Sequence, residues 1–236
     1  MTSKGHIKFE FEPPFTYIVV GNSGSGKTTL INHLLQTTFI PKFKKNIFIM
    51  SPTMKYSGDF QNFKETIEGK NHKNGEHYFY EWDTNVIKEI IEEQKYIIER
   101  HGKDRLPHIL IIIDDFMDKL HTSPAIDELF FRGRHFNIST ILLFQKLKGL
   151  SRVGRIQVKY LTFFRTANES ELEDIWDEYF SRTQKKKLEP IIHTCFEKPW
   201  SFIHLNLKTQ NFHHRISCGA DKKLIEYISP NNDLKK

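Results

Sequence analysis

The chain has 236 residues, which is enough for one substantial hydrophobic core, so we expect a single domain with short appendages rather than two domains. A formal net charge of +6 permits contact with a polyanion without requiring it. The two cysteines form no Cys-x-x-Cys pair, which argues against a disulfide framework and favours a reducing compartment. The charged start is broken by Pro13-Pro14 and has no apolar signal core, and no stretch is long enough to span a bilayer, so we expect a soluble protein.

The first predicted strand, residues 15–20, leads directly into a glycine-rich loop. Residues 21–28 read Gly-Asn-Ser-Gly-Ser-Gly-Lys-Thr and fit the pattern Gly-x-x-x-x-Gly-Lys-Ser/Thr, and a helix-like run begins at Thr29. Glycines allow the backbone to turn so tightly that successive N–H groups can point at phosphates, and the helix adds the positive end of its dipole. A loop of this kind between a strand and a helix predicts binding of a nucleoside triphosphate.

The two polar side chains that close the loop have separate expected roles. Lys27 reaches the outer phosphates, and the Thr28 hydroxyl can hold Mg²⁺. ATP is favoured over GTP, because the sequence contains no Asn-Lys-x-Asp guanine-reading motif and no Asp-x-x-Gly segment after a strand. The predicted nucleotide-binding residues are Gly21, Asn22, Ser23, Gly24, Ser25, Gly26, Lys27, Thr28 and Thr29.

A second strand is predicted over residues 46–50, followed by a polar segment over residues 57–83 that ends in an aromatic cluster. We expect Tyr80 and Trp82 to fold back onto the core; contact with a nucleotide base or with a neighbouring subunit is the alternative. A long helix is predicted next, over residues 84–100, because isoleucines recur on one side at helical spacing.

The third predicted strand, residues 108–113, carries an acidic pair at its end. Its five consecutive aliphatic residues, 109–113, are typical of a strand buried on both faces of a parallel sheet, and Asp114 and Asp115 follow them. In a parallel sheet these carboxylates emerge at the same edge as the phosphate loop. Asp114 is therefore expected in the Mg²⁺ shell, whereas Asp115 points elsewhere and is expected to polarise an attacking water.

The next helix is predicted to begin at Ser123, whose hydroxyl would cap it, with Pro124 in the first turn. A Gly-Arg-His segment, residues 133–135, then precedes a strand over residues 139–144 that is closed by Gln145. An amide at the end of the strand next to the acidic one can hydrogen-bond the attacking water or the outer phosphate. That role fits a strand inserted between the strand of the phosphate loop and the acidic strand.

Further strands are predicted over residues 158–164 and 201–207, and helices fall between most of the strands. This alternation predicts an α/β fold with right-handed crossovers, in which helices flank a mainly parallel central sheet. Together with the phosphate loop it resembles a P-loop NTPase of the RecA/ASCE-like type. The expected organisation is an N-terminal extension over residues 1–14, an ATPase domain over residues 15–208 and a C-terminal basic tail over residues 209–236.

The order of these motifs resembles the FtsK/HerA superfamily of hexameric DNA-pumping ATPases. The resemblance is carried by the phosphate loop, by Ile-Asp-Asp at 113–115, by Gly-Arg-His at 133–135 and by the strand-terminal Gln145, and it covers about residues 15–207. Within the superfamily the chain looks most like the poxvirus-type genome-packaging ATPases of large DNA viruses and virophages. The resemblance implies a homo-oligomeric ring, a hexamer or a pentamer, that clasps double-stranded DNA and drives it into a preformed capsid.

The resemblance also implies partners and further site residues. Capsid portal or vertex proteins would receive the ring, in the cytoplasm of the host cell or on the virion. A neighbouring subunit would donate an arginine that completes the site, and Arg132 or Arg134 are the matching positions, with Arg155 behind them. The predicted catalytic residues are thus Lys27, Asp115, Gln145, Arg134 and Arg132. The pair Asp-Asp departs from the Asp-Glu of many cellular relatives and makes the base one methylene shorter.

Two other classes of protein share the phosphate loop. A nucleoside or nucleotide kinase would have no use for a hydrolysis-directed Asp115 or Gln145, and a non-hydrolysing assembly protein would not need the complete set of Lys27, Thr28 and the acidic pair. The basic run over residues 185–187 is a secondary candidate for contact with nucleic acid.

Overall fold

The computed structural model describes residues 9–56, 58, 60, 63–64, 77–120, 122–197, 199–208, 211–215 and 226–228. Its strands are β1 (Thr16–Val20), β2 (Ile47–Met50), β3 (Tyr78–Phe79), β4 (Ile109–Asp114), β5 (Ile138–Phe144), β6 (Tyr160–Phe164), β7 (Phe202–Asn206), β8 (Asn211–Arg215) and β9 (Glu226–Ile228). The longer helices are α1 (Lys27–Leu34), α4 (Thr84–His101), α6 (Pro124–Arg132), α8 (Glu169–Tyr179) and α9 (Arg182–Cys195). Shorter helical segments are η1 (Leu35–Phe39), α2 (Ile40–Phe43), η2 (Thr53–Lys55), η3 (Lys103–Arg105), α5 (Met117–Leu120), η4 (Gly133–Phe136), η5 (Leu147–Gly149) and α7 (Arg152–Ile156).

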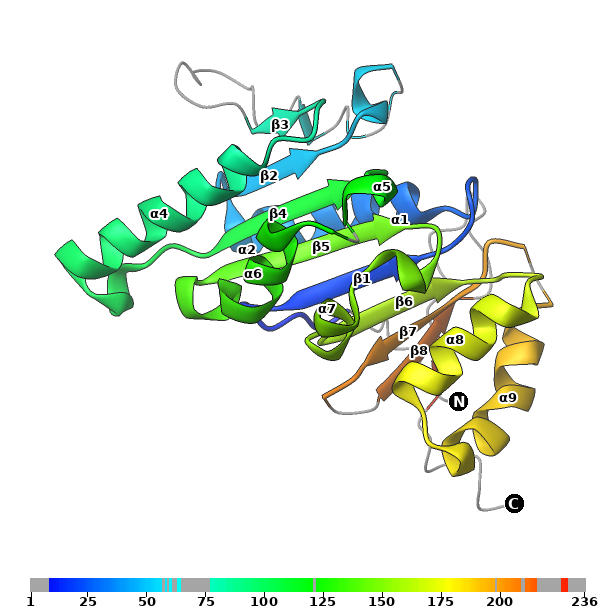
Figure 1. Ribbon diagram of the computed structural model, residues 1–236. Helices are drawn as coiled ribbons and strands as arrows, with labels where there is room; N and C mark the ends of the chain where they lie inside the picture. Colours follow the sequence, from blue (N-terminus) through cyan, green and yellow to red (C-terminus); the bar gives the residue numbers. More distant parts are fainter. Residues whose placement is uncertain are drawn as a thin grey trace, which may run out of the picture.

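All the described strands belong to one sheet, in the order β3-β2-β4-β5-β1-β6-β7-β8-β9 (Figure 1). The strands β3, β2, β4, β5, β1 and β6 run parallel to one another, and β7, β8 and β9 continue the sheet in antiparallel fashion. Strand β5 lies between β1 and β4, as the expected role of Gln145 requires. The predicted α/β fold with a mainly parallel sheet is confirmed, as are all six predicted strands within one or two residues at each end.

Burial on both faces explains the aliphatic run of β4. Leu110 and Ile112 pack in one cluster with α1, η1 and α2, whereas Ile109, Ile111 and Ile113 pack in a second cluster with α4, α6, α8 and α9. Successive side chains of a strand point to opposite faces, so an uninterrupted apolar run supplies both cores. Helices accordingly cover both faces of the sheet (Figure 1). No helix in the described part of the chain combines the length and apolar character of a membrane span.

The described segment before β1, residues 9–15, packs against the core. Phe9 and Phe11 are both buried, and the ring of Phe11 lies 4.8 Å from that of Tyr160 and 5.1 Å from that of Tyr17, measured between centroids. Tyr17 is on β1 and Tyr160 on β6, so the segment covers the face of the sheet that also carries α1.

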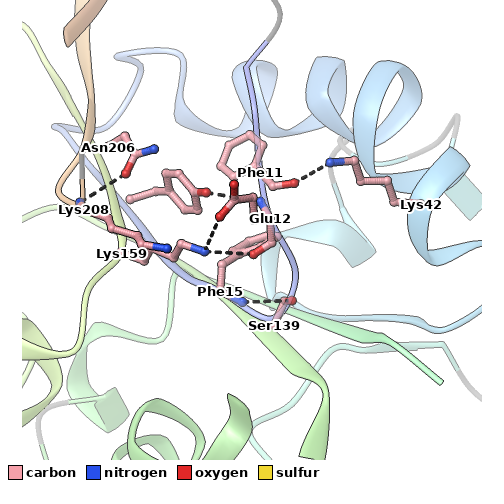
Figure 2. A network of polar contacts seen from close by, with 9 residues as sticks. Phe11, Glu12, Phe15, Lys42, Ser139, Lys159, Asn206 and Lys208 are labelled. Carbon is pink, nitrogen blue, oxygen red and sulfur yellow. Dashed lines mark hydrogen bonds and ion pairs between the residues drawn. The ribbon is translucent and has the colours of Figure 1, made fainter. Parts of the chain in front are cut away.

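Polar contacts hold the same segment at three points (Figure 2). Lys42 Nζ donates to the Phe11 carbonyl, and Lys159 Nζ donates to the Glu12 carbonyl over 3.1 Å. The Phe15 N–H donates to Ser139 Oγ over 3.2 Å, which attaches the start of β1 to β5. These contacts join the beginning of the chain to α2, β5 and the start of β6.

The sheet continues beyond the predicted strand at residues 201–207. Strand β8 pairs with β7 and β9 pairs with β8, and both lie within the segment 209–236 that the sequence predicts as a basic tail. Strand β3, which pairs with β2, was also not predicted. The proposed boundaries at residues 14 and 208 stay predictions.

The start of α6 agrees with the sequence in position but not in its capping contact, and α1 begins at Lys27, two residues before the predicted Thr29. Ser123 precedes α6 and Pro124 occupies its first turn, but the Ser123 hydroxyl makes no capping hydrogen bond and is buried without a partner in the described part of the chain. The prediction that this hydroxyl caps the helix is therefore wrong. Asn168 caps α8 by accepting a hydrogen bond from the Ser170 N–H over 3.1 Å.

The aromatic cluster after residue 76 packs against the core, as expected. Tyr80 is partly buried against the cluster on the α1 side, and the indole of Trp82 lies 5.4 Å from the ring of Phe116, measured between centroids. The rest of the polar segment, over residues 65–76, lies outside the described residues.

The packing of the first segment can be tested by truncating Phe11. Because this ring is 1% exposed, we expect Phe11→Ala to lower the free energy of unfolding by about 3–5 kcal/mol. The measurement is denaturant unfolding, with Glu10→Ala as the control because Glu10 is exposed on the same segment. A loss below about 1 kcal/mol for Phe11→Ala, within the range of ordinary surface substitutions, would contradict this packing.

Candidate functional site

The ends of three parallel strands bring the predicted site residues to one edge of the sheet. Val20 of β1 pairs with Phe144 of β5, and Leu143 of β5 pairs with Asp114 of β4. The residues that follow each strand, Gly21 and Gln145 among them, therefore lie side by side. The Gly21 N–H donates to the Phe144 carbonyl over 3.2 Å and fixes the start of the loop beside the end of β5.

The loop has the tight turns that its glycines allow. Gly26 precedes α1 with φ of 101°, a left-handed conformation that residues with a Cβ rarely adopt. Its carbonyl accepts the Leu30 N–H over 2.9 Å, and the Ser25 N–H donates to the Asn22 carbonyl over 3.1 Å. The helix that follows has its N-terminus at the loop, so its positive dipole end points at any anion bound there.

Gly21 lies in close contact with its neighbours. A Cβ at this position would be 2.7 Å from Ser25 Oγ and 2.8 Å from Phe164 Cβ. Ser25 Oγ is itself buried and has no hydrogen-bond partner in the described part of the chain, which suits a loop built to receive an oxygen-rich ligand. Phe164, the last residue of β6, thus lies beneath both ends of the loop, because a Cβ on Gly26 would also contact its ring.

Lys27 is half-buried inside the loop. Its Nζ donates to the Gly21 carbonyl over 2.6 Å and to the Asn22 carbonyl over 3.0 Å. Burial lowers the pKa of Lys27, and the negative charges of Asp114 and Asp115 oppose that shift. The ammonium group and both carboxylates are therefore close enough to interact electrostatically.

Thr28 and Asp114 connect the first turn of α1 to the acidic strand. Thr28 Oγ1 donates to Asp114 Oδ2 over 3.1 Å, and Asp114 is only 4% exposed. A hydroxyl and a carboxylate are oxygen ligands of the kind that Mg²⁺ takes when it also binds substrate phosphates. Across the described residues no group of three or more His, Cys, Asp and Glu side chains could hold a metal ion.

Asp115 and Gln145 flank this pair. Asp115 is exposed and has a φ of 62°, a left-handed conformation that costs a residue with a side chain about 1 kcal/mol or more. Its N–H donates to the Leu143 carbonyl, so it leaves β4 at the edge where β5 ends. Gln145 follows β5 directly and is partly buried.

The arginines lie at the other end of β5. Arg132 ends α6 and Arg134 lies in η4, which precedes the first residue of β5, so the seven residues of that strand separate them from Gln145 by about 20 Å. Both are exposed, and Arg132 Nη1 lies 3.8 Å from Glu128 Oε1. The structure therefore does not bring Arg132 or Arg134 to the phosphate loop of their own chain.

Arg155, the third position considered, is engaged within its own chain. Its Nε donates to Glu178 Oε2 over 2.7 Å, and its Nη1 donates to the Leu150 carbonyl over 2.7 Å. The basic run on α9 is only partly engaged: Lys185 Nζ lies 2.6 Å from Glu173 Oε2, and Lys186 and Lys187 are exposed.

A pocket beside the loop contains residues that the sequence analysis did not single out. One wall is the loop itself, and the others come from the C-terminal end of β6 with the residues after it and from the residues before β7. The newly identified lining residues are Phe164, Arg165, Ala167, Pro199 and Trp200. The sequence signal that was available is the position of Phe164 and Arg165 at the end of a predicted strand, the place where α/β folds bind ligands.

The tight packing of the loop predicts a cost for any side chain at Gly21. We expect Gly21→Ala to lower the free energy of unfolding by about 1–3 kcal/mol, because the new methyl group overlaps Ser25 and Phe164. The control is Gly58→Ala, since a Cβ at Gly58 meets nothing within 4 Å. Equal denaturant midpoints for the two variants would show that a methyl group at position 21 does not overlap Ser25 and Phe164.

The fold resembles that of solved ATPases, one viral and one bacterial. The crystal structure of B204, the DNA-packaging ATPase from Sulfolobus turreted icosahedral virus, superposes with a TM-score of 0.59 at 22% identity and covers 86% of this chain and 98% of its own. EssC (ATPases 2 and 3) from Geobacillus thermodenitrificans superposes with a TM-score of 0.51 at 14% identity, over 69% of this chain and 34% of its own. These matches confirm the predicted P-loop ATPase fold.

Sequence comparison identifies viral relatives. The DNA packaging protein OPG160 of variola virus is 30% identical over 151 residues, which are 64% of this chain and 53% of that protein. Protein 075L of invertebrate iridescent virus 6, described only as uncharacterized, is 29% identical over 164 residues, 69% of this chain and 58% of that protein. The chain spans about half the length of the curated relatives it matches. Because the profile of the Poxvirus A32 protein family matches residues 8–198, the chain belongs to that family.

Proposed function

We propose that this protein is an ATP-hydrolysing motor that moves double-stranded viral DNA into a preformed capsid. The observation that carries the proposal is the hydrogen bond of 3.1 Å between Thr28 and Asp114, which joins the phosphate loop to the acidic strand in a chain of the Poxvirus A32 family. The DNA packaging role of OPG160 and of B204 supports the same function. Neither relative supports the alternative of a nucleotide kinase.

The site residues divide the work of hydrolysis among them. The N–H groups of the loop and Lys27 bind the outer phosphates, and Thr28 and Asp114 would hold Mg²⁺. When bound, the metal neutralises charge on the phosphate oxygens. Asp115 accepts a proton from the attacking water, and Gln145 orients that water or the outer phosphate. Catalysis of this type consists mainly of positioning and electrostatic stabilisation, to which the half-buried Lys27 contributes.

An arginine from a neighbouring subunit completes the site. Arg132 and Arg134 are exposed about one strand length from their own loop, so they are available to another copy of the chain and not to their own phosphates. The resemblance to hexameric DNA-pumping ATPases implies the rest of the assembly, and on that basis we infer a homo-oligomeric ring of five or six subunits around DNA, with capsid portal or vertex proteins as its docking partners in the host cytoplasm. The net charge of +6 is compatible with this polyanion.

Phosphate release measured with and without double-stranded DNA tests the function. We expect the full chain to hydrolyse ATP, DNA of unrelated sequences to stimulate the rate to similar extents, and the stimulation to fall steeply with salt. Lys27→Ala is expected to lower turnover by about 10²-fold or more, since the outer phosphates lose their fixed positive charge.

Three results would contradict the proposal. Turnover of Lys27→Ala within a factor of about two of the parent would remove the assigned site. Transfer of the phosphate to a nucleoside acceptor, with no effect of DNA, would favour the kinase. Strong preference for one short duplex sequence would indicate a regulatory DNA-binding protein instead.

A mixing experiment tests the arginine supplied between subunits. Arg134→Ala and Lys27→Ala are each expected to be inactive alone and to recover part of the ATPase activity when mixed, because some interfaces then pair an intact loop with an intact arginine. Arg132→Ala is mixed in the same way. Arg105→Ala is the control, since Arg105 is exposed in η3 and is expected to be active without mixing. If mixed rings form and neither arginine variant recovers activity, the arginine between subunits lies elsewhere.

A further inference from the structure

The pocket beside the phosphate loop is formed by three separate segments. The loop contributes residues 22–25, the end of β6 contributes Phe164, Arg165 and Ala167, and the residues before β7 contribute Pro199 and Trp200. The Arg165 N–H donates to the Ser201 carbonyl over 2.9 Å and ties the second and third segments together. Since one wall is the loop itself, a ligand whose phosphates lie on the loop extends into the pocket without leaving the protein surface.

Trp200 is the most unusual residue of this pocket. Its side chain is 49% exposed although indoles are normally well covered, and its φ of 56° is left-handed for a residue with a bulky side chain. Ser201 and Phe202, which follow it, are fully buried, so the indole projects from a turn that leads directly into the buried strand β7. Backbone strain of this kind persists only where the surrounding structure holds it, and it concentrates at ligand sites.

We propose that the pocket takes the base of the nucleotide and that the base stacks on the indole of Trp200. The rest of the lining fits a planar aromatic ligand, since Ala167 and Pro199 offer small apolar surfaces and Arg165 adds a guanidinium plane that also stacks on aromatic rings. Stacking uses the flat face of the base, which every base possesses, and a purine offers a larger face than a pyrimidine. The inference rests on the proposed function, because it assigns the base subsite of the same nucleotide.

The contribution of the base to binding can be separated from that of the phosphates by comparing two ligands, ATP and inorganic tripolyphosphate, which has no base. Calorimetric titration of the full chain is expected to give tighter binding for ATP than for tripolyphosphate. Trp200→Ala should weaken ATP binding by about tenfold, within the range of base–aromatic stacking, and leave tripolyphosphate binding unchanged. The ratio of ATP affinity to CTP affinity should fall in the same variant, and Trp200→Phe should retain most of the ATP affinity.

Tyr96→Ala is the matched control, because Tyr96 is an aromatic side chain of similar exposure, 52%, on α4 and outside the pocket. It should bind both ligands like the parent. If Trp200→Ala binds ATP as the parent does, or loses ATP and tripolyphosphate equally, the base does not stack there. Loss of the oligomer in Trp200→Ala with no selective loss of ATP would place the indole at a subunit contact instead.

The same titrations distinguish failure of this inference from failure of the proposed function. A parent protein that binds neither ATP nor tripolyphosphate contradicts the proposed function and the base subsite together. A parent that binds both, with no selective effect of Trp200→Ala, leaves the phosphate site intact and overturns only the base subsite.

Discussion

Burial of the central strands on both faces is the constraint on which the rest of the structure depends. A strand such as β4, with every residue from Ile109 to Asp114 buried, can place charged groups only where it ends. Because β1, β4 and β5 run parallel and in register, their carboxyl ends meet at one edge. The loop, the acidic pair and Gln145 are therefore neighbours although more than a hundred residues separate the first from the last. The chemistry of the site follows from the packing of the sheet.

This dependence explains how much could be predicted from the sequence. Local sequence patterns predict the strands, because runs of aliphatic residues indicate burial. They also predict the loop, because its glycines and Lys27 are contiguous. The contact between Thr28 and Asp114 was also within reach, since both follow from strand ends in a parallel sheet. Among the strands, only the position of β5 in the sheet was predictable, because Gln145 gave a reason to place it between β1 and β4.

Side-chain partners that depend on packing were not predictable. The Ser123 hydroxyl has the right position for a cap and still makes no such bond, because local signals do not determine how a side chain is oriented once packing competes. Arg155 was a candidate for a neighbouring site until its partners on α8 and in the preceding loop were known. Trp200 lies 36 residues after Phe164, and only the pairing of β6 with β7 brings both to the loop.

Strand β5 has a consequence that extends beyond one site. Its seven residues are all buried and it is paired with β1 on one side and β4 on the other, and close-packed interiors of this kind have low compressibility and transmit strain. One end carries Gln145 and the other continues from the segment with Arg132 and Arg134. If Gln145 and the two arginines have the proposed roles, β5 links the phosphates bound by one subunit to those bound by the next. The order in which the subunits of the ring hydrolyse ATP would then depend on strain transmitted along this single strand.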